Sequence, residues 1–312
     1  MNRLVYVFPG QASQYVGMGQ ELAAKYEEAA AVFAEADAIL GWPLSRLCFS
    51  GPADELNRTE NTQPAVLTVS VACYRVLKAC GLRPQVVLGH SLGEYSALVA
   101  AGSFSFSQAL GLVARRARLM AEAVPQGQGG MVAILGLTAE QVVALCREVR
   151  DGIAEAANFN APGQVVVAGD RAGLAAITQL AKASGAKKVI PLPVSGPFHS
   201  SLMEPAARQL AEELLEIDIA APRVPVISNV TADYLTTATA VRESLLQQMV
   251  SPVRWQESIK RLLAEGYQTF VEVGPGNILS GLIKRMGKQL NIYQVGDSSS
   301  LKKTLAILQE AK

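Results

Sequence analysis

The feature that most constrains the fold is a short apolar strand that runs through a tight turn directly into a helix. The strand is expected at 84–88 and the turn is GHSLG, residues 89–93. Glycines on both sides of a serine allow a sharp strand-to-helix turn that exposes the hydroxyl, and the amide of Leu92 then points to where an oxyanion would form. An incidental serine in a turn is the alternative. The context favours a nucleophile elbow, with Ser91 as the nucleophile.

A serine hydroxyl needs a base within hydrogen-bond reach to attack at neutral pH. The chain has two histidines, His90 and His199. Side chains of adjacent residues diverge on a tight turn, so His90 is badly placed and His199 is the predicted base. Asp151 and Asp170 precede His199 in the chain, but neither belongs to the end of a main-sheet strand. We therefore expect a backbone carbonyl, instead of an acid, to orient the imidazole.

Helical spacing places one arginine on the apolar stripe of the helix expected at 107–123. The neighbours of Arg116 at three and four positions are Leu112, Val113, Leu119 and Met120. A buried guanidinium requires an anion. A structural ion pair, or a stem that reaches water, is one interpretation. The other is that the anion is a substrate carboxylate, held by the bidentate geometry that arginine offers.

The segment 129–192 differs from the rest of the chain because short strands and short helices follow one another quickly. Their order is βαββαβ, which is typical of a ferredoxin-like unit. Thr138 and Asp170 are the predicted helix caps, Thr138 with Gln141 as the second half of a capping box. This segment is interpreted as an insertion into a larger α/β domain.

Strands at 4–8, 224–228 and 268–273 and helices at 15–40 and from Gln63-Pro64 onward build that larger domain. We therefore predict an α/β fold: an α/β-hydrolase-like parallel-sheet body with an inserted small ferredoxin-like subdomain. The expected boundaries are 1–125 and 195–312 for the large catalytic subdomain and 126–194 for the small one. A cleft is expected between them.

Composition excludes several classes of protein. Half of the 312 residues are hydrophobic, and 28 basic against 27 acidic side chains give a formal charge of +1. This charge supplies no overall field for nucleic acid or an anionic membrane. The first apolar run is too short for a signal peptide and no segment is long enough to span a bilayer, so a cytoplasmic protein is expected. The four cysteines lack zinc spacing and are interpreted as buried free thiols. No metal or cofactor is predicted.

Several stretches resemble malonyl-CoA:acyl carrier protein transacylases and the related acyltransferase domains of fatty acid and polyketide synthases. The match runs in order along nearly the whole chain. The stretches are FPGQASQ (8–14), NTQPA (61–65), GHSLGEY (89–95), ANFNAPGQVVVAG (157–169), VSGPFHSSLM (194–203), PVISNVTA (225–232), SPVRW (251–255) and EVGPGNIL (272–279).

The resemblance implies a ping-pong transfer in which Ser91 takes malonyl from coenzyme A and passes it to the phosphopantetheine thiol of acyl carrier protein. By motif position, Gln11 and Leu92 supply the oxyanion-hole amides and His199 is the base. Arg116 grips the malonyl carboxylate, and the carbonyl of Gln248 orients the histidine. That carbonyl would take the place of the missing acid.

The chain departs from the family pattern at two positions. Ala117 stands where glycine is frequent, which could narrow the approach to the carboxylate. Phe198 stands where many free-standing members have serine; in related synthase domains phenylalanine goes with malonyl and serine with methylmalonyl, so Phe198 indicates malonyl. Gln63 and Asn160 are expected to line the site or to hydrogen-bond its loops. Glu94 is expected to interact with the helix N-terminus.

Other functions stay open on the sequence alone. A serine thioesterase or esterase would use the same elbow, a trans-acting polyketide synthase acyltransferase would use the same chemistry, and a non-catalytic module that binds carrier proteins could keep the fold. Carrier proteins are acidic, so docking is expected on basic groups near the cleft mouth, with two groups of candidates. These are Lys284, Arg285 and Lys288, or Lys187 and Lys188. A monomer is expected.

Overall fold

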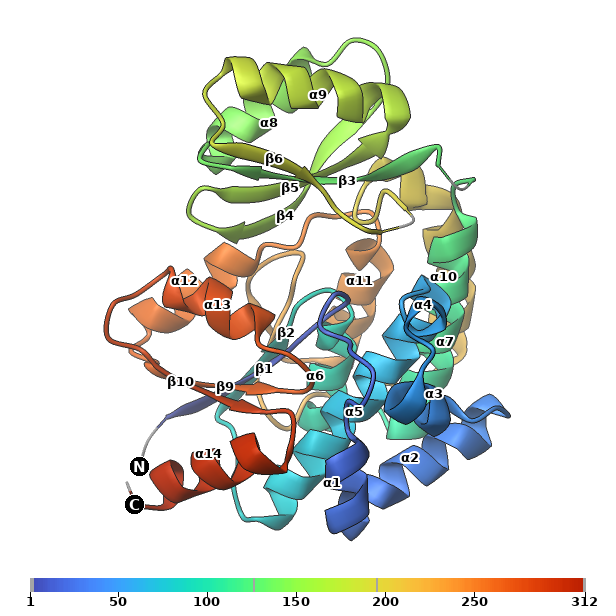
Figure 1. The fold of residues 1–312 in the computed structure, drawn as a ribbon, viewed down its shortest axis with the longest axis vertical. Coiled ribbons are helices and arrows are strands. Elements are labelled where there is room, and N and C mark those ends of the chain that lie inside the picture. Colours follow the sequence, from blue (N-terminus) through green and yellow to red (C-terminus); the bar gives the residue numbers. More distant parts are fainter. Residues whose placement is uncertain (1–2, 126, 195, 311–312) are drawn as a thin grey trace.

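The computed structural model describes residues 3–125, 127–194 and 196–310, in which the chain forms two sheets with helices around them (Figure 1). The larger sheet has six strands and the smaller has four. In Figure 1 the four-stranded sheet and its two helices lie above the body that holds the six-stranded sheet. The predicted subdomain boundaries involve residues 126 and 195, which lie outside the described residues.

The six-stranded sheet has the order β10-β9-β1-β2-β7-β8, and all of its neighbouring pairs are parallel except the last, β7 with β8. The predicted parallel-sheet body is therefore confirmed. Its strands are β1 (Leu4–Phe8), β2 (Val86–Gly89), β7 (Val226–Ile227), β8 (Tyr234–Leu235), β9 (Thr269–Val273) and β10 (Asn291–Val295).

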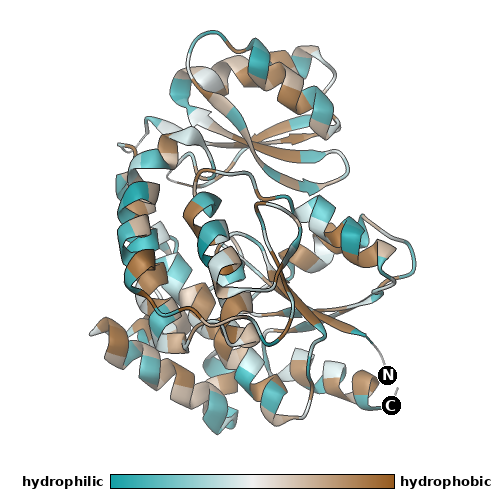
Figure 2. Cartoon of the chain, turned by 180° about the vertical axis from the view of Figure 1, so that it is seen from behind, coloured by the Kyte–Doolittle hydropathy of each residue, from teal (hydrophilic) through white to brown (hydrophobic). Residues whose placement is uncertain are grey.

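Apolar side chains cover both faces of this sheet, as expected for parallel strands between helices. Along β1, Tyr6 and Phe8 enter one core, while Val5 and Val7 enter the other. All four side chains are fully buried. The hydropathy colouring shows the strands as largely hydrophobic from behind as well (Figure 2). This double burial explains why the strand is a continuous apolar run in the sequence.

Helices cover both faces of the six-stranded sheet and one face of the four-stranded sheet. Helices α12 and α13 cover one face of the larger sheet, and α5, α6 and α7 contribute to the core on the other. The helices are α1 (Gln20–Lys25), α2 (Glu27–Leu40), α3 (Leu44–Ser50), α4 (Ala53–Leu56), α5 (Thr59–Ala79), α6 (Gly93–Ala101), α7 (Phe106–Glu122), α8 (Ala139–Glu148), α9 (Arg171–Ala183), α10 (Glu204–Glu216), α11 (Ala238–Gln248), α12 (Trp255–Ala264), α13 (Ile278–Lys284) and α14 (Ser298–Glu310), with a 3₁₀ turn η1 (Ser201–Met203).

The four-stranded sheet is antiparallel, with the order β4-β5-β3-β6. Its strands and helices follow the predicted βαββαβ sequence, and Thr138 and Asp170 cap α8 and α9. One face packs under these helices through Ile134 and Val167, whereas Met131 and Val166 on the other face join the core of the body. The strands are β3 (Gly129–Leu135), β4 (Ala154–Ala161), β5 (Gln164–Asp170) and β6 (Lys188–Pro191).

Two helix predictions were wrong in detail. The helix expected over 15–40 begins at Gln20 and is interrupted at Tyr26, whose backbone is extended. Helix α5 begins at Thr59 and not at Gln63, because Thr62 and its neighbours are tied to the preceding turn and the helix runs through Pro64.

The cysteines also differ from the prediction. All four are free, but only Cys48 and Cys73 are buried, while Cys80 and Cys146 are partly exposed. Cys80 follows the last residue of α5 and Cys146 lies in the last turn of α8, so both are near the ends of helices.

Candidate active site

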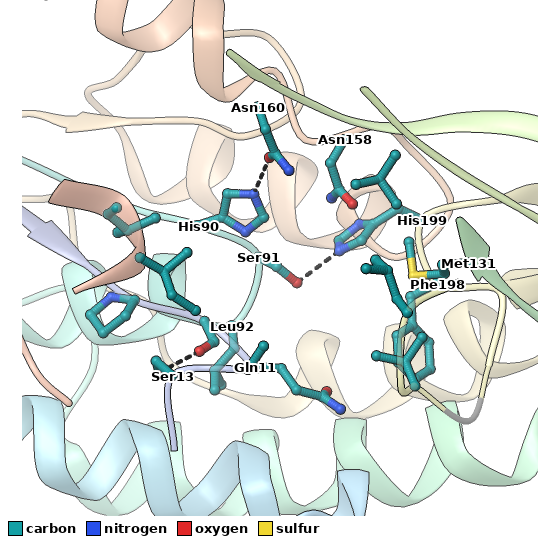
Figure 3. A pocket seen from close by; sticks show the side chains of 18 of the residues that line it. Gln11, Ser13, His90, Ser91, Leu92, Met131, Asn158, Asn160, Phe198 and His199 are labelled. Carbon is teal, nitrogen blue, oxygen red and sulfur yellow. Dashed lines mark hydrogen bonds between the residues drawn. The ribbon is translucent and has the colours of Figure 1, made fainter. Parts of the chain in front are cut away.

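The turn at 89–93 joins β2 to α6, and both of its glycines are required by close backbone approaches. A Cβ on Gly89 would lie 1.9 Å from the Gly93 carbonyl carbon, and one on Gly93 would lie 2.0 Å from the carbonyl oxygen of Phe8. Ser91, at the apex, has a positive φ of 52°. Its hydroxyl therefore stands clear of the backbone and faces His199 (Figure 3).

Asn229 holds this turn from the side, a role that sequence reasoning did not assign. Its Oδ1 accepts a hydrogen bond from the Ser91 amide, and its Nδ2 donates to the Gly89 carbonyl oxygen, each at 2.6 Å. The side chain is buried in the loop after β7. One amide thus satisfies a donor and an acceptor of the turn, which limits the movement of the nucleophile.

His199 meets Ser91 from a distant part of the chain. Its Nε2 lies 2.7 Å from Ser91 Oγ, and its Nδ1 lies 2.9 Å from the Gln248 carbonyl oxygen and 3.2 Å from that of Ser251. A carbonyl can only accept, so Nδ1 carries the proton and Nε2 is left to accept from the serine. The Gln248 carbonyl is available because this residue ends α11, where helix carbonyls lack partners within the helix.

Burial and a neighbouring cation keep His199 neutral. Desolvation, followed by repulsion from Arg116, lowers the pKa of His199 from 6.5 to about 3. At neutral pH the imidazole therefore carries no charge and can accept a proton. His90, by contrast, is turned away: its Nε2 lies 2.8 Å from Asn160 Oδ1, and its ring packs against Trp255.

Arg116 is fully buried on α7 and contacts the nucleophile. Its Nη1 donates to Gln63 Oε1 at 2.5 Å, and its Nη2 donates to Gln248 Oε1 at 3.1 Å and to Ser91 Oγ at 3.3 Å. Burial lowers the pKa of Arg116. Among the described residues no carboxylate forms an ion pair with it, and its Nε has no partner there. The guanidinium is therefore a buried cation held by neutral groups, beside the serine.

A cavity of about 240 Å³ opens over these residues. Gln11 and Leu92 line it together with Ser91, and the Gln11 side chain donates to Thr59 Oγ1. Phe198 and Met131 form part of the apolar wall (Figure 3). A small cavity of this kind, largely apolar with a few convergent polar groups, suits a short acyl chain with one charged end.

Gln63 and Asn160 also line the cavity, but each is occupied with another side chain. Gln63 receives the hydrogen bond from Arg116 and lies 3.4 Å from Met120 Sδ. Asn160 binds His90. The structure therefore places both as supports of the site's side chains.

Glu94 lies in the first turn of α6, but its carboxylate binds residues of other segments and not the N-terminus of its own helix as expected. It is fully buried and accepts hydrogen bonds from Gln248 Nε2 at 2.7 Å and from the Asn229 amide at 3.3 Å. Burial raises the pKa of Glu94 from 4.5 to about 7. The Gln248 side chain and Asn229 were missed in the sequence because amide side chains with long-range partners leave no periodic pattern.

Among the described residues there is neither a cluster that could hold a metal ion nor a helix that could span a membrane. In residues 3–125, 127–194 and 196–310, no cluster of three or more His, Cys, Asp or Glu side chains is placed to hold a metal ion. The helices of the same residues include none that is long and apolar enough to cross a membrane.

Comparisons with known proteins relate the chain to acyl transferases along nearly its whole length. The family model described as "Acyl transferase domain" matches residues 5–304. A malonyl CoA-acyl carrier protein transacylase of Bacillus subtilis is 47% identical over 99% of this chain and 98% of its own length, and one of Escherichia coli K12 is 45% identical over 98% and 100%.

Solved structures show the same likeness. An acyl carrier protein S-malonyltransferase from Vibrio cholerae superposes with a TM-score of 0.95 at 45% identity, covering 97% of this chain and 100% of that one. A malonyl-transacylase in complex with a type II polyketide synthase acyl-carrier protein gives 0.95 at 44% identity, covering 98% and 100%. The chain therefore belongs to the acyl transferase domain family.

Proposed function

We propose that the protein moves a malonyl group from coenzyme A, through an ester on Ser91, to the phosphopantetheine thiol of acyl carrier protein. The observation that carries this proposal is that one hydroxyl, Ser91 Oγ, is shared between His199 Nε2 at 2.7 Å and Arg116 Nη2 at 3.3 Å. The nucleophile thus has a neutral base on one side and a cation on the other. The names of the relatives support malonyl and carrier protein as substrates.

In the first half-reaction, Ser91 Oγ attacks the thioester carbonyl while its proton passes to His199 Nε2. The backbone amides of Gln11 and Leu92, two residues that line the cavity, would stabilise the oxyanion. The bond from carbon to the coenzyme A sulfur then breaks, and the sulfur leaves with the proton from His199. In the second half, the carrier-protein thiol gives its proton to His199, attacks the ester, and Ser91 leaves with that proton.

Arg116 would bind the far carboxylate of the malonyl group. Its guanidinium is held by the oxygen atoms of Gln63 and Gln248, and these neutral amides leave its charge uncompensated. A carboxylate there would also offset the repulsion that lowers the pKa of His199, so binding of the charged acyl group would make the base stronger. Malonyl is favoured over acetyl for both reasons.

Phe198 precedes the base and lies in the apolar wall of the cavity. Its ring would crowd a methyl branch on the α-carbon of the acyl group. This supports malonyl over methylmalonyl, and a trans-acting enzyme of polyketide synthesis remains the second candidate because its chemistry would be the same.

A thioesterase would use the same elbow but would admit water to the acyl-enzyme. Transfer is favoured because His199 is oriented by carbonyls, and because the buried cation at Arg116 suits one end of a dicarboxylic acyl group. Incubation with malonyl-CoA, with and without carrier protein, distinguishes them. A transferase should hydrolyse little malonyl-CoA in the absence of carrier protein and release coenzyme A rapidly in its presence. Hydrolysis at a rate that carrier protein does not change would favour the thioesterase.

The carrier protein is proposed to dock beside α13, whose Ile278, Leu279 and Leu282 line the cavity. Lys284, Arg285 and Lys288 are exposed at the end of this helix, although Arg285 is partly engaged with Gln164. Lys187 and Lys188 are less suited to docking. Lys188 pairs with Leu135 at the last residue of β3, four residues along the strand from Met131, which lines the cavity. Salt should raise KM for carrier protein. A KM unchanged by salt would count against this surface.

The most direct test is intact-mass measurement after brief incubation with acetyl-, malonyl- and methylmalonyl-CoA together. The proposal predicts a malonyl adduct that is lost in Ser91→Ala and disappears when carrier protein is added. An adduct of mixed composition, or none, would contradict it. Action as a monomer in the cytoplasm stays a prediction.

A further inference from the structure

A buried carboxylate lies beneath the reacting residues and takes no part in the transfer steps above. Glu94 is the second residue of α6, is fully buried and does not line the cavity. Its oxygen atoms accept hydrogen bonds from Gln248 Nε2 at 2.7 Å, the Asn229 amide at 3.3 Å and Ser244 Oγ at 3.4 Å. Burial of a charged group is costly unless it is hydrogen-bonded, so we ask what the buried Glu94 carboxylate contributes to the site.

The Gln248 amide, which is the strongest of these partners, has a defined polarity. Its Nε2 donates to Glu94 Oε2 and to the Ser91 carbonyl oxygen at 3.1 Å, while its Oε1 accepts from Arg116 Nη2. Reversal of the amide would place its NH2 group against the guanidinium and its oxygen against two acceptors. An ionised carboxylate can only accept and a guanidinium can only donate, so the ionised form of Glu94 and Arg116 together favour the orientation that is seen.

This orientation reaches the reacting atoms in one further step. The Arg116 Nη2 that binds Gln248 Oε1 also binds Ser91 Oγ. Glu94 therefore acts on the nucleophile along two routes, through the guanidinium and through the Ser91 carbonyl. Hydrogen bonds linked in this way inside a protein reinforce one another, and removal of one member affects the rest.

Glu94 also lies close enough to Arg116 for the two charges to attract each other. The charged and titratable groups that face Glu94 are Arg116 on α7 and Tyr95 on its own helix, and the attraction to Arg116 opposes the effect of burial on the pKa of Glu94. Gln248 separates the carboxylate from the guanidinium. The attraction therefore acts without a direct ion pair, and no carboxylate among the described residues is hydrogen-bonded to the Nη groups of Arg116.

We propose that Glu94 is a positioning residue for the transfer: its carboxylate orients the Gln248 amide, which in turn holds Arg116 beside the Ser91 hydroxyl and anchors the Ser91 carbonyl. The proposal rests on the proposed function, since it assumes that Arg116 binds the acyl carboxylate. It adds a determinant of acyl selectivity that makes no contact with the substrate.

The test compares Glu94→Ala with Glu94→Gln. Alanine removes the acceptor, so kcat/KM for malonyl-CoA should fall about 30-fold, and that for acetyl-CoA only about threefold, because acetyl does not use Arg116. Glutamine keeps an oxygen that can accept from Gln248 and Asn229, so it should restore malonyl transfer to within about threefold of the wild type. Equal losses for both acyl groups, or a glutamine variant as impaired as alanine, would overturn the proposal.

A second pair shows whether the effect runs through Gln248. Gln248→Met keeps the backbone carbonyl that orients His199 but removes the side-chain hydrogen bonds to Glu94, Arg116 and the Ser91 carbonyl. It should reduce malonyl selectivity as Glu94→Ala does, and the double variant should be no worse than either single one. Additive losses would refute the relay, and this variant also tests it if Glu94→Ala fails to fold.

Leu98→Ala, on the same helix and fully buried, is the matched control for lost packing. It should lower stability while the ratio of malonyl to acetyl activity is kept. Failure of the proposed function would show differently, as a wild-type enzyme that forms no malonyl-serine adduct. Failure of the present proposal would leave that adduct intact and make Glu94→Ala as selective as the wild type.

Discussion

The parallel sheet and the antiparallel sheet meet at one cavity, but they contribute different things to it. The body around the parallel sheet brings Ser91, His199 and Arg116 together from three separate segments. The antiparallel sheet adds Met131 and Val166 to the cavity wall. The proposed chemistry therefore lies in the body, while the smaller sheet shapes part of the cavity.

The two parts are joined by backbone at one strip. Val253 exchanges hydrogen bonds with β4: the Phe159 amide donates to the Val253 carbonyl, and the Val253 amide donates to that of Ala157. Two residues earlier, the carbonyl of Ser251 lies beside His199 Nδ1. The wall is thus continuous with the backbone that orients the base, so the division between the two parts can be tested by mutation.

The largest effect is expected for the base. His199→Ala should lower kcat for malonyl transfer by about 10⁴-fold or more, because the serine loses its proton acceptor. Stopped-flow release of coenzyme A measures it. A matched change in the wall, Met131→Ala, should cost far less; similar losses in both variants would break the division between chemistry and shape.

Arg116→Ala should come next, with malonyl transfer about 100-fold slower, or about 2.7 kcal/mol of transition-state stabilisation. Acetyl transfer should rise relative to malonyl, since the cation no longer lowers the basicity of His199. Competition between the two thioesters, read by intact mass, gives the ratio. An equal loss for both would mean that Arg116 serves only the fold.

Phe198→Ser should widen the wall without touching the chemistry. Methylmalonyl should gain about tenfold in kcat/KM relative to malonyl, which is the range that one methyl group supports in an apolar pocket. The same competition assay measures the change. If malonyl remains as strongly preferred, the exclusion must come from the antiparallel sheet, and Val166→Ala would locate it.

Stability as a function of pH should report on the buried carboxylate of the body. The folded-state pKa of Glu94 is about 7, above its ordinary 4.5, so the folded state binds more protons between these values. Its contribution to the free energy of unfolding is therefore favourable at low pH and is lost as pH rises through about 7. Urea denaturation should show that the free energy of unfolding of Glu94→Gln, relative to that of the wild type, is higher at pH 8 than at pH 5.5.

His199 acts in the opposite direction, because its lowered pKa makes stability fall as pH drops from about 6.5 toward 3. The effect of Glu94 must therefore be read as the difference between variant and wild type at each pH. A difference that does not change between pH 5.5 and 8 would contradict the raised pKa of Glu94.

The smallest effect is expected for the contact between Asn160 and His90. Asn160→Ala leaves a buried imidazole nitrogen without its partner, at a cost of about 1 kcal/mol in the free energy of unfolding. Thermal denaturation measures it. Activity should change by less than threefold if Asn160 only supports the site, whereas a larger loss would give the antiparallel sheet a direct part in the chemistry.

Local signals in the sequence carried most of the fold. The elbow was predictable because the strand, both glycines and the helix are contiguous, and the βαββαβ order because its caps and turns lie close together. The apolar neighbours of Arg116 likewise identified a buried cation.

The supports of the site could not be predicted in the same way. Asn229 and the Gln248 side chain bind residues more than a hundred positions away. Amides serve in many kinds of hydrogen bond, and only the packed fold decides which partners they meet. Likewise, periodicity alone does not show the break at Tyr26, where the backbone is extended between two helices.

Ser91 and His199 both adopt the left-handed backbone region, with φ of 52° and 60°. Side chains branched at Cβ are strongly disfavoured there. A threonine in place of the serine would keep a hydroxyl group yet could not hold the sharp apex without distorting it. Cysteine, which is unbranched, is the replacement that the backbone would tolerate, so this scaffold can exchange oxygen for sulfur more readily than it can accept one extra methyl group.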